Sequence, residues 1–115
     1  MSFCYAQLQT HNHEGAKSFY QTLFGWTVAD SQPHYSEMNT GGPIGAGVMP
    51  AQNPHAPSFW LPYILVQDLD AKLGEAETLG AKTMAPPMAV PGKGRYAVIT
   101  DPSGAAIGLW QVEKK

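Results

Sequence analysis

An internal repeat constrains the fold of this chain more than any other feature of its sequence. The segment AKSFYQTLFG, residues 16–25, returns 55 residues later as AKLGEAETLG. The same shift places Tyr5 on Trp60, and a shift of 61 places Gly47 on Gly108 in the last strand of each half. The matched helix, its terminal glycine and the matched final strand together indicate a duplicated unit.

Apolar spacing and turn residues predict the elements of the first half. Apolar residues at i, i+3, i+4 and i+7 predict a helix at residues 13–24, capped by Asn12 and ended by Gly25. The expected strands lie at residues 3–10, 26–29, 35–39 and 44–49. The first half is therefore predicted to be βαβββ.

The second half follows the same order. It opens with the strand FWLPYILV, residues 59–66, in which Pro62 indicates an edge or a bulge. Asp68 can cap a helix that runs to Leu79. The remaining elements are a strand at residues 82–84, the loop APPMAVPGKG and a β-hairpin at residues 94–111 around the type I turn DPSG.

Length and composition favour one compact domain. The 115 residues, 43% of them hydrophobic, are expected to form a single domain with module 1 at about residues 1–50, a linker at 51–58 and module 2 at about 59–115. A net charge of -2 gives no reason to expect nucleic acid or an acidic membrane as a partner.

The chain shows no apolar leader and no apolar run of about 18 residues, so the expected location is the cytoplasm. Its single cysteine, Cys4, cannot form an internal disulfide, which fits a reducing compartment. Cys4 is either a reactive thiol or, as is commoner in an apolar strand, a small inert hydrophobe.

Two segments, FYQTLFGWTV and RYAVITDPSGAAIGLWQ, resemble the glyoxalase, bleomycin resistance and extradiol dioxygenase superfamily, also called vicinal oxygen chelate proteins. The resemblance extends over essentially the whole chain. It implies an α+β fold in which two βαβββ modules form a cup-shaped, incomplete barrel sheet. It says little about activity, because one fold serves many functions.

In the metal-dependent members of this superfamily, four His or Glu side chains point into the cup from the first and last strands of each module. The resemblance places these positions at Tyr5, Gly47, Trp60 or its neighbour Leu61, and Gly108. This set lacks the three protein ligands usual for a catalytic zinc ion. We therefore expect no metal at this position and no cofactor.

His11 and His13 form the most ligand-like spacing in the chain, with Glu14 beside them. They lie where a strand passes into a helix N-terminus, so the alternative is that they serve as caps and helix-start groups. The isolated loop histidines His34 and His55 are expected to be solvated.

Strand alternation assigns residues to the cup. If Leu8 packs beneath the first helix, Tyr5 and Gln7 face the cup, and the shift of 55 assigns Trp60 and Ile64 to the same surface. The expected ligand-binding residues are Tyr5, Gln7, Gly47, Met49, Trp60, Gly108 and Trp110. Flat aromatic walls, a flexible methionine and two glycine gaps suit an aromatic or amphipathic small molecule. The alternative is a closed core in which the aromatic side chains pack against one another, and Gly47 and Gly108 could equally permit a close approach of the two strands.

Catalytic candidates are few. Glu37 on a central strand could act as a general base, although a strand glutamate more often faces solvent. Tyr35, Arg95 and Tyr96 could orient an anion or a carbonyl group.

Three functions follow. The leading prediction is a metal-independent small-molecule binding protein. The first alternative is an enzyme, either a glyoxalase-like lyase or a metal-free acid-base catalyst that uses Glu37, and the second is an interaction subunit with a filled cup. A homodimer is expected, because pairing about a twofold axis would cover open sheet edges and exposed aromatic side chains.

Overall fold

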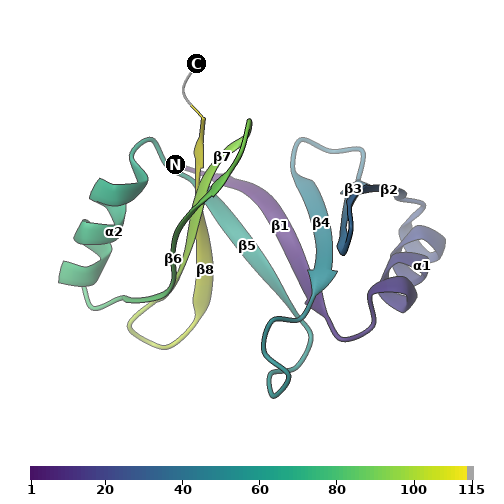
Figure 1. Ribbon diagram of the computed structural model, residues 1–115, viewed down its shortest axis with the longest axis horizontal. Helices are drawn as coiled ribbons and strands as arrows, with labels where there is room; N and C mark the ends of the chain where they lie inside the picture. Colours follow the sequence, from purple (N-terminus) through teal and green to yellow (C-terminus); the bar gives the residue numbers. More distant parts are fainter. Residues whose placement is uncertain (114–115) are drawn as a thin grey trace. The chain divides into compact units, whose positions relative to one another are not determined.

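The computed structural model describes residues 1–113 (Figure 1). The chain divides into two compact units, an N-terminal unit of Cys4–Leu61 and a C-terminal unit that combines Met1–Phe3 with the residues from Pro62 onward. Each unit pairs one α-helix with a sheet, which confirms the expected α+β class. No helix in the described part of the chain is long and apolar enough to cross a membrane.

The N-terminal unit folds as βαβββ. Its elements are β1 (Phe3–Thr10), α1 (His13–Phe24), β2 (Thr27–Gln32), β3 (Tyr35–Asn39) and β4 (Gly45–Pro50). The strands lie in the order β2-β3-β4-β1, with β1 parallel to β4 and the other neighbours antiparallel. In Figure 1, α1 lies beside this sheet.

Local signals set both ends of α1. The Asn12 side chain accepts a hydrogen bond from the backbone N–H of Gly15 at 3.0 Å, as expected of an N-cap. Gly25 adopts φ 72°, a left-handed conformation that ends the helix at low cost only for glycine or asparagine. The predicted helix is therefore confirmed at both ends.

One face of the N-terminal sheet packs against α1. The buried residues of this core are Leu8, Met38, Ala46 and Val48, and Ala16, Tyr20, Trp26 and Val28 pack against them. Because side chains alternate along a strand, the neighbours of these residues on β1, β3 and β4 lie on the opposite face. That opposite face is where the sequence places most of the N-terminal candidate site.

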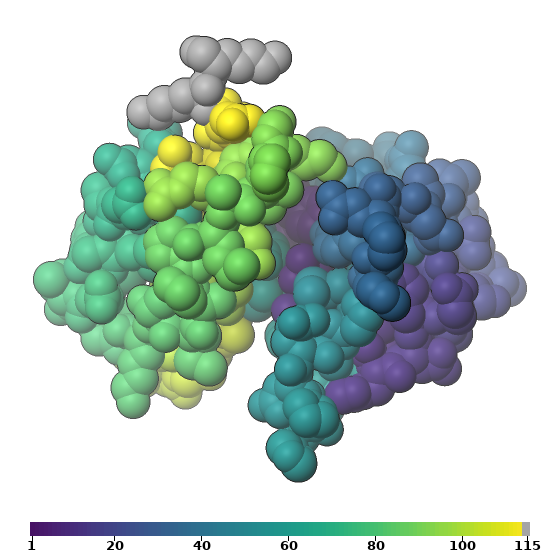
Figure 2. All heavy atoms as spheres, in the orientation of Figure 1, coloured from purple at the N-terminus to yellow at the C-terminus, as the bar shows by residue number. Residues whose placement is uncertain are grey.

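Residues 51–58 connect β4 to β5 through a mostly exposed loop, which stands out from its unit in Figure 2. His11 contacts this loop through its side chain, because its Nε2 lies 2.6 Å from the carbonyl oxygen of Ala56. The backbone N–H of His11 also donates to Ser58 Oγ at 3.0 Å.

The C-terminal unit repeats the arrangement. Its elements are β5 (Phe59–Leu65), α2 (Leu69–Thr78), β6 (Lys82–Val90), β7 (Gly94–Thr100) and β8 (Ala106–Val112). Strand β5 belongs to this unit from Pro62 onward. The strands lie in the order β5-β8-β7-β6, with β5 parallel to β8. The core beneath α2 consists of Val66, Leu69, Leu73, Ala97, Ile99 and Leu109.

The expected loop after Met84 is wrong, because β6 continues through it to Val90. The pairing of β6 with β7 shifts between Ala85 and Met88, and the two prolines lie inside this interruption. Because β6 is the last strand of its sheet, a proline there removes no hydrogen bond to a further strand.

The closing hairpin is confirmed, since β7 and β8 pair along their whole lengths. The backbone N–H of Gly104 donates to the carbonyl of Asp101 at 2.9 Å, which closes the turn. The Asp101 carboxylate also accepts from the backbone N–H groups of Ser103 and Ala105. The predicted turn residues thus act through local hydrogen bonds.

A polar network that is buried at Lys17 and Ser36 and exposed at Asp30 joins α1 to β2 and β3. Ser36, only 1% exposed, donates its hydroxyl proton to Asp30 at 2.6 Å, so the His13 ring nitrogen 2.9 Å away is the donor to Ser36. Lys17 lies mostly buried and donates to the same Asp30 oxygen at 3.0 Å. The Ser36 hydroxyl and the Lys17 ammonium lower the pKa of Asp30 below its ordinary value.

The stabilisation that Asp30 provides should therefore disappear in acid. A carboxyl group with a lowered folded-state pKa contributes stability above its unfolded-state pKa of about 4, and the contribution is lost as the pH falls through the folded-state pKa. We expect Asp30→Asn to be less stable than wild type in urea unfolding at pH 7, with the gap narrowing towards pH 2. Glu77→Gln is the control for removal of an exposed carboxylate. A gap of constant size would show that the Asp30 charge does not stabilise the fold.

Candidate functional site

The face of the N-terminal sheet turned away from α1 carries a group of polar and aromatic side chains, here named the polar face. Its members are Tyr5, Gln7, Gln9, Tyr35, Glu37 and Met49. The register places Gln7 and Glu37 on either side of Gly47, in one row across three strands. Four predicted ligand-binding residues, Tyr5, Gln7, Gly47 and Met49, and the candidate base Glu37 therefore share one face.

Two tyrosine hydroxyl groups meet over Gly47. The hydroxyl oxygens of Tyr5 and Tyr35 lie 2.5 Å apart, within hydrogen-bonding distance. The Tyr5 ring lies along Gly45, and a Cβ atom on Gly47 would collide with both hydroxyl groups. Glycine at this position is thus what allows the hydroxyl pair to form.

The face of the C-terminal sheet turned away from α2 is mainly apolar and is here named the aromatic face. Its members are Tyr63, Leu65, Met88, Tyr96, Val98 and Trp110, identified because they alternate with or pair across from the residues of the α2 core. The rings of Tyr63 and Tyr96 meet edge to face with centroids 6.3 Å apart. The Tyr96 hydroxyl donates to the sulfur of Met88 at 3.6 Å.

The two glycines were expected to leave open space, and the structure corrects this expectation. A Cβ atom on Gly108 would collide with the ring of Tyr63, its partner across the β5–β8 pairing. On Gly47 it would collide with the hydroxyl groups of Tyr5 and Tyr35. At both positions an aromatic side chain from a neighbouring strand fills the space that glycine leaves.

Trp60 does not lie where the sequence placed it. Its indole N–H donates to the Tyr20 hydroxyl of α1 at 3.2 Å, and the two rings meet edge to face. Ile64 likewise packs against the core beneath α2 and not on the aromatic face. In β5 the odd-numbered residues, including Leu61 and Tyr63, are the ones that face away from the helices. The expected alternation of β5 was therefore wrong by one residue.

Tyr63 is the residue that the sequence reasoning missed, and the helix N-caps carried the signal. Asn12 and Asp68 cap the two helices and are 56 residues apart, whereas the terminal glycines, Gly25 and Gly80, are 55 apart. A shift of 56, as the caps require, would have matched Tyr63 in the second half to Gln7 in the first. The cause is that the stretch from N-cap to terminal glycine is one residue shorter in the second half.

Other candidate residues serve the fold. The Arg95 guanidinium donates to both carboxylate oxygens of Asp70 on α2, at 3.0 and 3.1 Å, and lowers the pKa of that carboxyl group. His11 and His13 bind different partners, the loop carbonyl of Ala56 and Ser36. Burial raises the pKa of the Cys4 thiol, which disfavours a reactive thiolate.

The four positions that the superfamily resemblance assigns to metal ligands are Tyr5, Gly47, Leu61 and Gly108 once β5 is placed in its observed register. Two glycines and a leucine offer no side-chain donor atom, so this set does not fit a divalent ion. Within residues 1–113, no three His, Cys, Asp or Glu side chains gather as a metal site would require.

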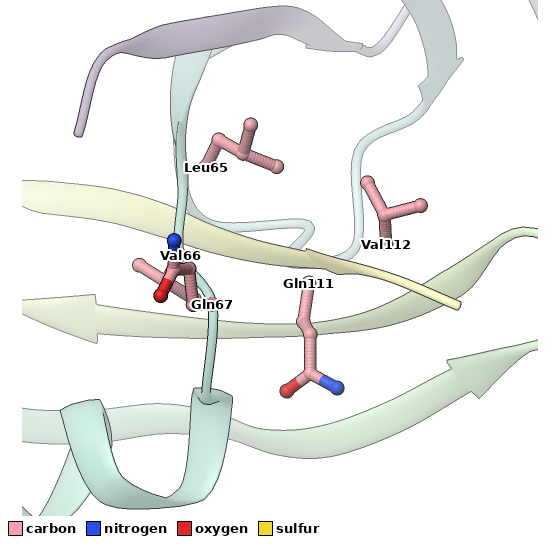
Figure 3. Close-up of a pocket in the computed structure, with 5 residues that line it drawn as sticks. All are labelled: Leu65, Val66, Gln67, Gln111 and Val112. Atoms are coloured by element: carbon pink, nitrogen blue, oxygen red, sulfur yellow. The ribbon is translucent and has the colours of Figure 1, made fainter. Parts of the chain in front are cut away.

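A cavity of about 400 Å³ lies at the ends of β5 and β8. Figure 3 shows Leu65 and Val112 on one side of these strands and Gln111 pointing to the other side, towards α2. The Gln111 side-chain oxygen already accepts from the backbone N–H of Leu69 at 2.7 Å. The cavity is thus an indentation at a strand end of the C-terminal unit.

The two βαβββ units, with glycines at matched positions on their last strands, define the class of protein as a duplicated βαβββ protein of the glyoxalase-like fold. A family model for the Glyoxalase/Bleomycin resistance protein/Dioxygenase superfamily matches residues 3–109. The chain therefore belongs to this superfamily.

Relatives of known sequence and structure agree with this assignment. The chain is 36% identical over 118 residues to a Mycobacterium tuberculosis protein named "Putative glyoxylase CFP32", covering 96% of this chain and 45% of that protein. It is 35% identical over 111 residues to the anthracycline biosynthesis protein DauV of Streptomyces sp., covering 81% and 40%. The chain thus spans less than half the length of these curated relatives.

A solved structure shows the same fold. Methylmalonyl-CoA epimerase from Mycobacterium tuberculosis superposes with a TM-score of 0.75 at 13% identity, covering 97% of this chain and 88% of that chain. At this identity the likeness concerns the fold and not the chemistry.

Proposed function

We propose that this protein binds an aromatic or amphipathic small molecule without a metal ion, through the polar face of its N-terminal unit. The observation that carries the proposal is the hydroxyl pair of Tyr5 and Tyr35 over Gly47. At the position where metal-dependent members of the superfamily supply a ligand, this chain has glycine and directs two phenol groups to that point.

The pair has chemistry suited to an oxygen-bearing ligand. When two hydroxyl groups bond to each other, one proton lies between the two oxygens and the other is directed away from the pair. A ligand carbonyl or carboxylate oxygen that reaches this point would accept a hydrogen bond from the pair, and the Gln9 amide, which donates to the Gln7 side-chain oxygen at 3.2 Å, carries a second N–H on the same face. The rings of Tyr5 and Tyr35 and the side chain of Met49 on the same face suit an aromatic portion of the ligand.

Two names among the relatives fit this ligand class in different ways. One relative is named an anthracycline biosynthesis protein, and the other carries the name of a glyoxylase. The second name supports an enzyme as the alternative function. Glu37 would be its base, because it lies in register with Gly47 beside the hydroxyl pair. There it could remove a proton from a carbon atom next to a carbonyl group that the hydroxyl pair holds.

The proposal predicts that tyrosine hydroxyl groups determine affinity. A panel of aromatic ketones, aldehydes and carboxylates should contain compounds that raise the melting temperature, since a ligand at about 100 times its Kd adds about 2.7 kcal/mol of stability. Tyr5→Phe and Tyr35→Phe should each weaken the binding of such a compound about 2- to 12-fold, as expected for one hydrogen bond. Isothermal titration calorimetry of the wild type and each variant measures this change.

The control is Tyr20→Phe, which removes a hydroxyl group on the α1 side of the same unit. It should leave the Kd unchanged, and so should treatment with a chelator. Equal effects of all three substitutions, or binding that disappears with the chelator, would contradict the proposal. Exchange of a ligand C–H proton in D2O that is lost in Glu37→Gln would establish the enzyme instead.

A further inference from the structure

Irregular backbone surrounds Tyr35, which supplies one hydroxyl group of the pair on the polar face. His34, the residue before it, has φ 66°, and no other non-glycine residue in the described part of the chain has a positive φ. On the facing strand, the register of β2 with β3 shifts by one residue between Asp30 and Gln32, and Gln32 is the partner of Tyr35. A positive φ is uncommon outside glycine, and a bulge of this kind redirects the side chains beside it. The chain therefore departs from regular hairpin geometry at the residues next to Tyr35.

Ser36 holds β3 from the other side of the sheet. Neighbouring side chains on a strand point to opposite faces, so Tyr35 lies on the polar face and Ser36 on the side of α1. Ser36 is 1% exposed; its hydroxyl group donates to Asp30 of β2 at 2.6 Å and accepts from the His13 ring of α1 at 2.9 Å. The pairing of β3 with β4 begins at the same residue, opposite Val48. Ser36 is thus the first residue of β3 that is held by α1, β2 and β4 together.

The hydroxyl pair leaves little room for Tyr35 to move. Its hydroxyl oxygen lies 2.5 Å from that of Tyr5, and β4 lies between the two strands that carry these residues. A Cβ atom on Gly47 would collide with the hydroxyl oxygen and Cζ of Tyr35, so this end of the ring lies directly against the backbone of β4. Hydrogen bonds weaken steeply when their distance and angle leave a narrow range. A small shift at the start of β3 would therefore separate the two hydroxyl groups.

We propose that Ser36 is a positioning residue for Tyr35. Its hydrogen bonds to Asp30 and His13 fix the start of β3 and so hold the Tyr35 hydroxyl group where a ligand oxygen would accept from it. Lys17 supports this arrangement, because it donates at 3.0 Å to the same Asp30 oxygen that accepts from Ser36. The effect on affinity rests on the proposed function, whereas the effect on the hydroxyl pair does not. Residues on the helix side of the sheet thereby control a site on its opposite face.

The first test needs no ligand, because it follows the tyrosine hydroxyl groups by NMR. In protein labelled with carbon-13 at the tyrosine Cζ atoms, the phenylalanine variants assign the resonances of Tyr5 and Tyr35. Ser36→Ala should shift both resonances towards the position of a solvated tyrosine, because the pair separates. The matched control is Met38→Ala, which truncates a side chain that is 3% exposed on the same face of β3 and should leave both resonances in place. Unchanged resonances in Ser36→Ala, or equal shifts in Met38→Ala, would overturn the proposal.

The second test measures the affinity for 2-naphthoate, a carboxylate on a planar aromatic ring system, by isothermal titration calorimetry. Ser36→Ala should weaken binding about 2- to 12-fold, the effect expected for losing the hydrogen bond of Tyr35. In a Tyr35→Phe background the same substitution should cause no further loss, since the hydroxyl group that it misplaces is already absent. An equal loss in both backgrounds would mean that Ser36 only stabilises the fold, and the proposal would then be wrong.

Asp30 supplies a second pair of variants if Ser36→Ala does not fold, because its side chain is 67% exposed. Asp30→Ala should weaken 2-naphthoate binding as Ser36→Ala does. Asp30→Asn keeps an oxygen atom that can accept from Ser36, so it should retain most of the affinity despite its lower stability. Equal losses in the two variants would contradict the proposal. A wild type that does not bind 2-naphthoate would count against the proposed function alone, and the tyrosine resonances would then decide whether Ser36 positions Tyr35.

Discussion

Replacing Gly108 with leucine should lower the free energy of unfolding by about 1–3 kcal/mol or more, the cost of forcing extra volume into a packed region. The first added atom would already collide with the ring of Tyr63, so the strain begins at Cβ. Gly108→Ala should therefore destabilise in the same direction by a smaller amount. Urea unfolding followed by far-ultraviolet circular dichroism measures both changes.

A double-mutant cycle with Tyr63 isolates the cause. In a Tyr63→Ala background the penalty of Gly108→Ala should shrink markedly, because the ring that it strikes has gone. Gly74→Ala is a matched control, since Gly74 lies inside α2 with open space around its would-be Cβ atom. That change should stabilise the protein by about 0.5–1 kcal/mol. A Gly108→Leu protein as stable as wild type would mean that the space above Gly108 is open.

Leu69→Ala should have the largest effect on stability, lowering the free energy of unfolding by about 2–5 kcal/mol. Leu69 is fully buried at the first turn of α2, in the core with Val66, Leu73 and Ala97. Removing its side chain leaves a cavity that the surrounding strands can fill only in part. The same residue is held at the backbone by Gln111, so the helix start cannot shift freely to close the gap.

The matched control is Leu79→Ala, which removes the same atoms from a side chain that is 70% exposed. Its effect should stay within about 0.5 kcal/mol. Hydrogen exchange should show that the loss of protection in Leu69→Ala is greatest in the backbone amides of α2 and β8, which share its core. Equal destabilisation by the two alanine variants would mean that α2 is not anchored through Leu69.

Sequence and structure differ most clearly in β5. The shift of 55 matches the terminal glycines of the two helices, but the stretch from N-cap to terminal glycine is one residue shorter in the second half, so the shift misplaces the strand before α2 by one residue. In a strand, a shift of one residue moves every side chain to the opposite face. Trp60 therefore packs against Tyr20 of α1, and Tyr63 takes the place beside Gly108.

The strand β6 and the two glycines show a second kind of difference. Pro86 and Pro87 predict a break in a strand from their chemistry alone, yet a strand at the end of a sheet tolerates them. A glycine in a strand predicts a close approach of another group, as proposed for Gly47 and Gly108. Whether that group is a ligand or a neighbouring side chain depends on residues distant in sequence, here Tyr35 and Tyr63.

The sequence by itself determined the order of the elements, the span of α1, the caps Asn12 and Asp68 and the DPSG turn, because these depend on hydrogen bonds and backbone preferences within a few residues. It also determined the superfamily, since a whole-chain pattern of turns and strands carries that signal. Only the tertiary structure decided which face of β5 each side chain occupies and what fills the space above each glycine. Those features depend on the pairing of strands distant in sequence, where a single-residue difference in the spacing from N-cap to terminal glycine moves every side chain of the strand to the opposite face.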